Sequence, residues 1–163
     1  TDDRKIYNLD PDWYGSFNTA LKYKNVDLQL DFYTVQGITK NNPYLYGFDQ
    51  GGSLNGKKNG IKVDYWTENN PSNSAPRPQF TASVPYMASI AIQDASYFRF
   101  RSATLGYTLP KKWITKMHMT NARIYATATN IFTITDYKSY SPEREPGSYP
   151  EPKTYTFGIN VSF

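Results

Sequence analysis

The last eleven residues of the chain alternate between two kinds of side chain. The larger set comprises Lys153, Tyr155, Phe157, Ile159, Val161 and Phe163, and the small polar set comprises Thr154, Thr156, Gly158, Asn160 and Ser162. Because successive side chains of a β-strand point to opposite faces of its sheet, this pattern predicts a strand over residues 153–163. Such a strand has one apolar face and one small polar face, so the fold must give each face its own environment.

Four more segments alternate in the same way: 13–24, 26–37, 95–109 and 121–135. The first two are separated only by Lys24 and Asn25, which predicts a β-hairpin. Together with the last segment, they predict an all-β fold with five antiparallel strands.

The alternation changes phase inside one of these five segments, 95–109. Phe98 and Phe100 share one parity, whereas the apolar residues from Ala103 onward share the other. A β-bulge near Ser102 would bring both sets to the same face. Alternatively, Phe98 and Phe100 belong to a loop above the sheet, and the sequence leaves both arrangements open.

The connections between the five strands alternate in length. Residues 38–94 and 136–152 form long connections, whereas the other two connections are short. Long loops without secondary structure are uncommon in compact soluble domains. Outer-membrane barrels, in contrast, have long extracellular loops and short periplasmic turns. This alternation favours five strands of a transmembrane β-barrel, with residues 38–94 and 136–152 outside the cell.

The composition suits two classes of all-β protein. Aromatic residues reach 17%, yet the hydrophobic fraction is only 39% and the mean hydropathy is −0.66. A transmembrane β-barrel fits, because its polar lumen keeps the mean hydropathy low. A soluble carbohydrate-binding β module fits as well. A transmembrane helix is excluded, because it needs about 20 consecutive apolar residues.

Several kinds of chemistry are excluded or disfavoured by the residue counts. The chain has no cysteine, which excludes disulfides and thiol catalysis, and its one histidine, His118, disfavours a histidine-based metal centre. Its net charge of +4 comes from scattered residues, which argues against a nucleic-acid partner. Asp27 and Asp31 share a strand face, but solvated acids are expected on a lumen face. We therefore predict no enzyme activity, no cofactor and no metal site.

Five segments resemble the SusC/RagA family of TonB-dependent outer-membrane transporters: Asn8–Phe17, Gly56–Trp66, Ala95–Pro110, Asn130–Tyr137 and Thr154–Phe163. The resemblance implies a 22-stranded barrel with a plug domain in its lumen. It also implies a SusD-like surface lipoprotein that covers the barrel, and energy supplied through TonB. Members of the family import glycans or peptides across the outer membrane of Bacteroidetes.

Five strands cannot close a barrel, because an open sheet edge in lipid leaves backbone groups unpaired. The chain also starts at Thr1, without an initiator Met or a signal peptide. We therefore expect it to be the C-terminal part of a larger transporter, residues 1–163 being one piece of its barrel. The plug and the region that contacts TonB would lie in the missing part. An alternative role is a transporter-like barrel that serves as a scaffold in an outer-membrane assembly.

The strand 95–109 carries the first group of candidate contact residues, Tyr97, Arg99 and Arg101. A charge that faces lipid at mid-depth costs about 2–4 kcal/mol. We therefore expect these side chains to face the lumen or to lie above the membrane, where they would contact substrate or plug, or form part of a water-filled wall.

The long loop carries a second group of candidates, Tyr44, Tyr46 and Trp66. These aromatic side chains would stack on sugar rings or dock the lipoprotein, or else form a small core of the loop itself. The terminal Phe163 resembles the signal by which the assembly machinery recognises outer-membrane barrels.

Overall fold

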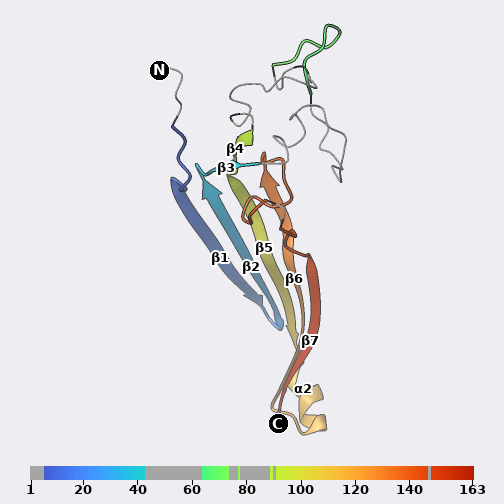
Figure 1. Ribbon diagram of the computed structural model, residues 1–163. Helices are drawn as coiled ribbons and strands as arrows, with labels where there is room; N and C mark the ends of the chain where they lie inside the picture. Colours follow the sequence, from blue (N-terminus) through green and yellow to red (C-terminus); the bar gives the residue numbers. More distant parts are fainter. Residues whose placement is uncertain (1–5, 43–63, 74–76, 78–88, 90, 147) are drawn as a thin grey trace. The chain divides into compact units, whose positions relative to one another are not determined.

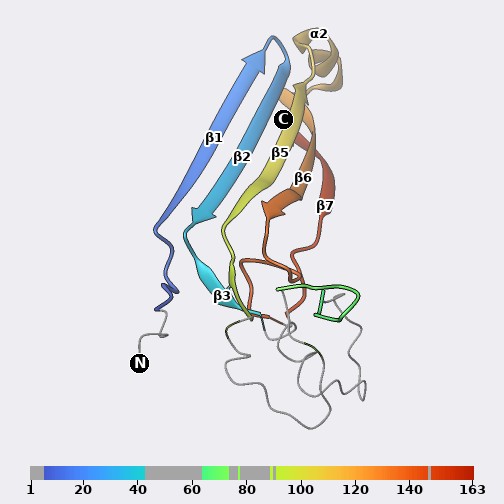
Figure 2. The same cartoon turned by 90° about the horizontal axis from the view of Figure 1, so that it is seen from above.

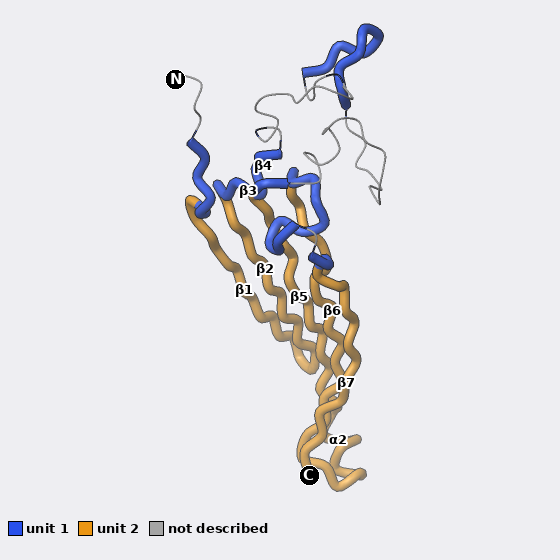
Figure 3. Tube along the Cα trace, viewed as in Figure 1, with its two compact units in different colours: residues 1–11, 37–95, 136–150 blue, residues 12–36, 96–135, 151–163 orange. Residues whose placement is uncertain are grey.

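A computed structural model describes residues 6–42, 64–73, 77, 89, 91–146 and 148–163. The chain divides into two compact units, which we describe separately (Figure 3). The sheet unit comprises residues 12–36, 96–135 and 151–163. The loop unit comprises residues 1–11, 37–95 and 136–150.

The sheet unit contains five strands in the order β1-β2-β5-β6-β7, all antiparallel to their neighbours (Figure 1). Their bounds are β1 Trp13–Tyr23, β2 Val26–Gln36, β5 Tyr97–Thr108, β6 Asn121–Thr135 and β7 Thr154–Ser162. Strands that follow one another in this unit are therefore neighbours in the sheet. The predicted all-β class, with five antiparallel strands, is confirmed.

The register of the sheet lines up residues of one kind across all five strands. One row runs Leu21, Leu28, Leu105, Ala126 and Phe157. The row beside it runs Lys22, Asp27, Gly106, Tyr125 and Gly158. Side chains of adjacent rows point to opposite faces. The sheet consequently has one apolar face and one polar face.

The apolar face is exposed in the part of the chain that the structure describes. Phe157 is 81% exposed and Leu21 is 58% exposed. Burying an apolar side chain of this size is worth about 1.5–3 kcal/mol, so soluble proteins rarely leave many such side chains in water on one face. A sheet of this kind requires an apolar environment on that side.

A bulge interrupts the register at Arg101. On β2, Asp31 pairs with Ser102 and Phe32 pairs with Phe100, so Arg101 is the extra residue of β5. The predicted bulge near Ser102 is therefore present, and Phe98 lies within β5 rather than in a loop.

The phenylalanines beside the bulge stack across the strands on the apolar face. The ring centroids of Phe32 and Phe100 lie 4.5 Å apart, and those of Phe17 and Phe32 lie 6.2 Å apart. Phe100 also makes an edge contact with Phe132 on β6 at 5.7 Å. Aromatic pairs in these arrangements add about 0.5–1.5 kcal/mol beyond the area that they bury.

Short connections lie together at one end of the sheet (Figures 1 and 2). They are the β1–β2 turn and the helical turn formed by α2 Lys111–Ile114 and η2 Thr115–Met117. The amide of Thr108 donates to the carbonyl of Asn25, and the amide of Thr120 donates to that of Ser162. No helix in the described ranges has the length and apolar character needed to cross a membrane.

The loop unit contains a short ladder that the sequence analysis did not predict. β3 Thr39–Asn41 pairs antiparallel with β4 Ile92–Asp94. The predicted loop 38–94 thus begins and ends in paired backbone. In its described segment 64–73, Thr67 and Asn70 form a single bridge, and the Asn70 side chain donates to Asp64 Oδ1 at 2.8 Å.

Asn130 provides a test of the bulge, because its φ is 52° and its side chain donates to the carbonyl of Pro152 at 2.9 Å. In the full-length protein, Asn130→Val should lower the free energy of unfolding by about 1–2 kcal/mol. This is the cost of a left-handed backbone for most L-residues, which asparagine adopts more readily than valine. Asn130→Gly should cost less, because glycine adopts positive φ readily. Urea unfolding in detergent, followed by gel mobility of unheated samples, measures both. A Val variant as stable as the Gly variant would contradict the strained geometry.

Candidate functional site on the polar face of the sheet

The predicted residues Tyr97, Arg99 and Arg101 come together on the polar face, next to Tyr33 of β2. The Arg99 guanidinium lies 5.3 Å from the centre of the Tyr97 ring, and that of Arg101 lies 5.2 Å from the Tyr33 ring. The two tyrosine rings are 6.1 Å apart. Cation–π contacts of this length contribute about 0.5–1 kcal/mol when exposed and more when desolvated.

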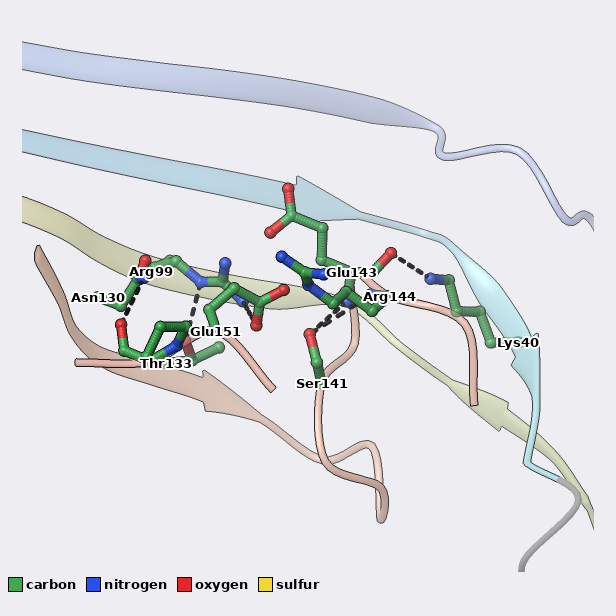
Figure 4. Close-up of polar contacts among 9 residues, drawn as sticks. Lys40, Arg99, Asn130, Thr133, Ser141, Glu143, Arg144 and Glu151 are labelled. Carbon is green, nitrogen blue, oxygen red and sulfur yellow. Dashed lines mark hydrogen bonds and ion pairs between the residues drawn. The ribbon is translucent and has the colours of Figure 1, made fainter. Parts of the chain in front are cut away.

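Arg99 is buried and its guanidinium is bonded to neighbouring segments. Its Nε donates to Thr133 Oγ1 at 3.0 Å, and its Nη2 lies 3.4 Å from Glu151 Oε2 (Figure 4). The side chains of Arg99 and Glu151 are 6% and 15% exposed. Removing one partner of a buried ion pair leaves an uncompensated charge. Arg99 therefore joins β5 to β6 and to the segment before β7.

Arg101 is the member of this group with the most accessible charge. Its Nε donates to Asp31 Oδ2 at 2.7 Å and its Nη2 donates to Asp31 Oδ1 at 3.2 Å. The Arg101 side chain is nevertheless 48% exposed. A guanidinium has five N–H donors and stays charged, so it can hold one carboxylate and still donate to another oxygen.

A second ion pair, between Arg123 and Asp27, lies nearer the short-turn end of the same face. Arg123 Nε donates to Asp27 Oδ1 at 3.0 Å. Arg123 is on β6 and Asp27 is on β2, so the side chain crosses β5. It does so over Gly106, where an added Cβ would collide with the Arg123 guanidinium. The sequence analysis considered Asp27 and Asp31 as a carboxylate pair, whereas the structure bonds each of them to an arginine.

Gly158 gives Tyr125 the same clearance that Gly106 gives Arg123. A Cβ on Gly158 would collide with the phenol of Tyr125, so the phenol ring lies across β7. A residue-by-residue alignment of the predicted strands could have revealed both contacts, since each glycine is the polar-face neighbour of a long side chain. The sequence analysis missed them because it did not align the strands residue by residue.

Between the two ion pairs, the polar face carries small uncharged groups. The hydroxyl oxygens of Thr104 and Thr127 are 2.9 Å apart. A hollow of about 380 Å³ opens beside them; its lining includes Asn18, Ala20, Gln29, Asp31, Ser102 and Thr104. Amide and hydroxyl groups both donate and accept hydrogen bonds, so this surface can bind a polar solute or a polypeptide segment.

The remaining predicted residues lie elsewhere. Tyr44 and Tyr46 are outside the described residues. Trp66 belongs to the loop unit and is 37% exposed. Phe163 follows β7 at the short-turn end of the sheet and is 87% exposed. In the described ranges, no group of three histidine, aspartate or glutamate side chains is placed to hold a metal ion.

These features define a class of protein. A sheet of long antiparallel strands with an exposed apolar face, a polar face and short turns at one end has the architecture of an outer-membrane β-barrel wall. No family model matches the chain.

Curated relatives specify the class further. The chain is 31% identical to TonB-dependent receptor P3 of Formosa agariphila. The alignment runs over 180 residues and covers 100% of this chain and 18% of the relative. It is 28% identical to the TonB-dependent receptor SusC of Bacteroides thetaiotaomicron, over 89% of this chain and 14% of that protein. The chain thus spans less than a fifth of the length of these relatives.

Solved structures agree with the sequence relatives. The RagAB peptide importer in the open-open state superposes with a TM-score of 0.79 at 29% identity, over 98% of this chain and 18% of that one. The RagAB peptide transporter gives the same TM-score at 28% identity. The resemblance to the SusC/RagA family of TonB-dependent receptors is confirmed over nearly the whole chain, and the fold is that of a segment of their barrel.

Gly106 provides a test of the polar face. In the full-length protein, Gly106→Ala should lower the urea midpoint of unfolding, because the new Cβ displaces Arg123 from Asp27. Gly15→Ala is the matched control, since a Cβ there would meet nothing closer than 3.5 Å. Combining Gly106→Ala with Asp27→Asn should add less than the sum of the two single effects. Equal midpoints for the Gly106 and Gly15 variants would contradict the role of the glycine.

Proposed function

We propose that this chain forms part of the barrel of a TonB-energised importer in the outer membrane of a Bacteroidetes-like Gram-negative bacterium. Its apolar sheet face would contact lipid and its polar face would line the lumen. The observation that carries the proposal is the two-faced sheet. The chain that contains this sheet matches a RagAB structure over 98% of its length. A soluble carbohydrate-binding module does not fit well, because it would have to expose Phe157 and its apolar neighbours to water.

The proposed cargo is a glycan or a peptide, as the family resemblance implies, and one of the similar solved structures is a peptide importer. TonB would act through a part of the protein outside this chain, and a SusD-like lipoprotein would cover the outer loops. This piece would supply barrel wall and outer loops and carry out no bond chemistry.

Within this scheme, the exposed Arg101 would contact substrate or plug, while Tyr97 and Arg99, which are both buried in the structure, would hold the strands in place. The loop residues Tyr44, Tyr46 and Trp66 would contact the lipoprotein or the cargo. Phe163 would act as the signal for barrel assembly.

Uptake by intact cells tests the proposed transport. A strain that lacks the full-length gene should lose growth on its glycan or peptide source, and wild-type protein should restore it. Arg101→Ala should restore less uptake than Lys112→Ala, an exposed residue of α2 at the short-turn end, at equal amounts of assembled barrel. Full uptake in the deletion strain on every glycan and peptide source would contradict an importer and favour a scaffold.

Substitutions in β7 test the proposed contact with lipid. Arginine in place of Ile159 or Val161 should impair barrel assembly, because a charge in hydrocarbon costs up to about 2–4 kcal/mol, depending on depth. Arginine in place of Asn160 or Ser162, on the other face of the same strand, should be tolerated. Heat-modifiable gel mobility of outer-membrane fractions measures the assembled fraction. Equal assembly in both sets would show that the facing is wrong.

A further inference from the structure

The loop unit has a polar interior centred on Asn42, which is fully buried. Its side-chain Nδ2 donates to Gln93 Oε1 at 3.1 Å and to the carbonyl of Lys138 at 2.9 Å. Its backbone amide donates to the carbonyl of Ala91 at 2.6 Å. One residue thus bonds to the segment around β4 and to the segment after β6, which are far apart in sequence.

Neighbouring contacts join the same segments. The amide of Lys138 donates to Gln93 Oε1 at 3.3 Å, so one side-chain oxygen receives donors from two segments. The hydroxyl of the buried Tyr137 donates to the carbonyl of Asn41 at 3.3 Å. Lys40 Nζ donates to the carbonyl of Glu143 at 3.0 Å (Figure 4). Two of these contacts join β3 to the segment after β6, and the third joins that segment to β4.

The chemistry of these groups favours asparagine at position 42. A buried polar group must be hydrogen-bonded, and here the two N–H bonds of one amide are both used. Aspartate has the same shape but cannot donate when ionised, and alanine leaves Gln93 Oε1 and the Lys138 carbonyl without this donor. Burial also raises the pKa of the Tyr137 phenol above its ordinary value.

We infer that Asn42, Gln93, Tyr137 and Lys138 form a clasp that makes residues 37–42, 91–95 and 136–144 move as one body. A partner or cargo that displaces one of these segments then displaces the others. The inference concerns hydrogen bonds inside the loop unit and does not depend on the proposed transport.

Amide hydrogen exchange on the full-length protein in detergent tests the clasp. Asn42→Ala and Asn42→Asp should speed exchange about tenfold or more at 37–42 and also at 136–144, including the Lys138 amide, because buried groups lose their partner. Asn41→Ala is the matched control, since the contact described for Asn41 uses its backbone carbonyl, and it should change neither segment. Unheated gel mobility shows that each variant is assembled.

Faster exchange confined to residues 37–42, or unchanged exchange in both segments, would overturn the inference. If the Asn42 variants do not assemble, Gln93→Ala decides the question. It removes the acceptor that Asn42 and Lys138 share, so it should also speed exchange on both sides of the clasp. A Gln93→Ala protein with normal exchange at 136–144 would overturn the inference as well.

Discussion

The two-faced sheet depends on keeping the strand faces in phase through β5, and the bulge at Arg101 does this. The extra residue lets Phe98 and Phe100 share a face with Leu105. In an uninterrupted strand, Arg99 would lie on the same face as Leu105, because both have odd numbers. A charge on a lipid-facing surface costs about 2–4 kcal/mol at mid-depth, and the buried contacts of Arg99 would also be lost. One inserted residue therefore separates apolar from charged side chains along the whole strand.

The polar face is then organised by ion pairs between segments. Arg99 bonds to Glu151, Arg101 to Asp31 and Arg123 to Asp27, so the acid and the base come from different segments in each pair. The pairs of Arg101 and Arg123 are partly solvated, and such pairs contribute little to stability. Their geometric effect is larger, because each paired arginine is held against the sheet and leaves the hydroxyls of Thr104 and Thr127 accessible between the pairs. In the proposed barrel, this arrangement presents a wall of fixed shape to whatever occupies the lumen.

The alternation of side chains was sufficient to predict the five strands and their two faces, and the alternating lengths of the connections gave their antiparallel order. The bulge near Ser102 was one of two arrangements that the sequence left open. The alternation was also sufficient to group Tyr97, Arg99 and Arg101, although not to distinguish the buried Arg99 from the exposed Arg101. The contact of Arg123 with Asp27 was missed because it spans three strands and depends on a glycine between them. The β3–β4 ladder and Asn42 were missed because three-residue strands have no measurable period, and burial of a single amide leaves no pattern in sequence.

The opposite facing of neighbouring residues along β5 is the central claim, and nitroxide scanning tests it directly. The 163-residue chain has no cysteine, so single cysteines from Phe98 to Leu105 can each carry a label in a cysteine-free full-length protein in lipid. The proposed barrel predicts that labels at Phe98, Phe100, Ala103 and Leu105 are relaxed by oxygen dissolved in lipid, whereas the label at Thr104 is relaxed by a water-soluble nickel complex. The phase should change once, at Arg101. An alternation that continued without this change, or no alternation at all, would contradict the account.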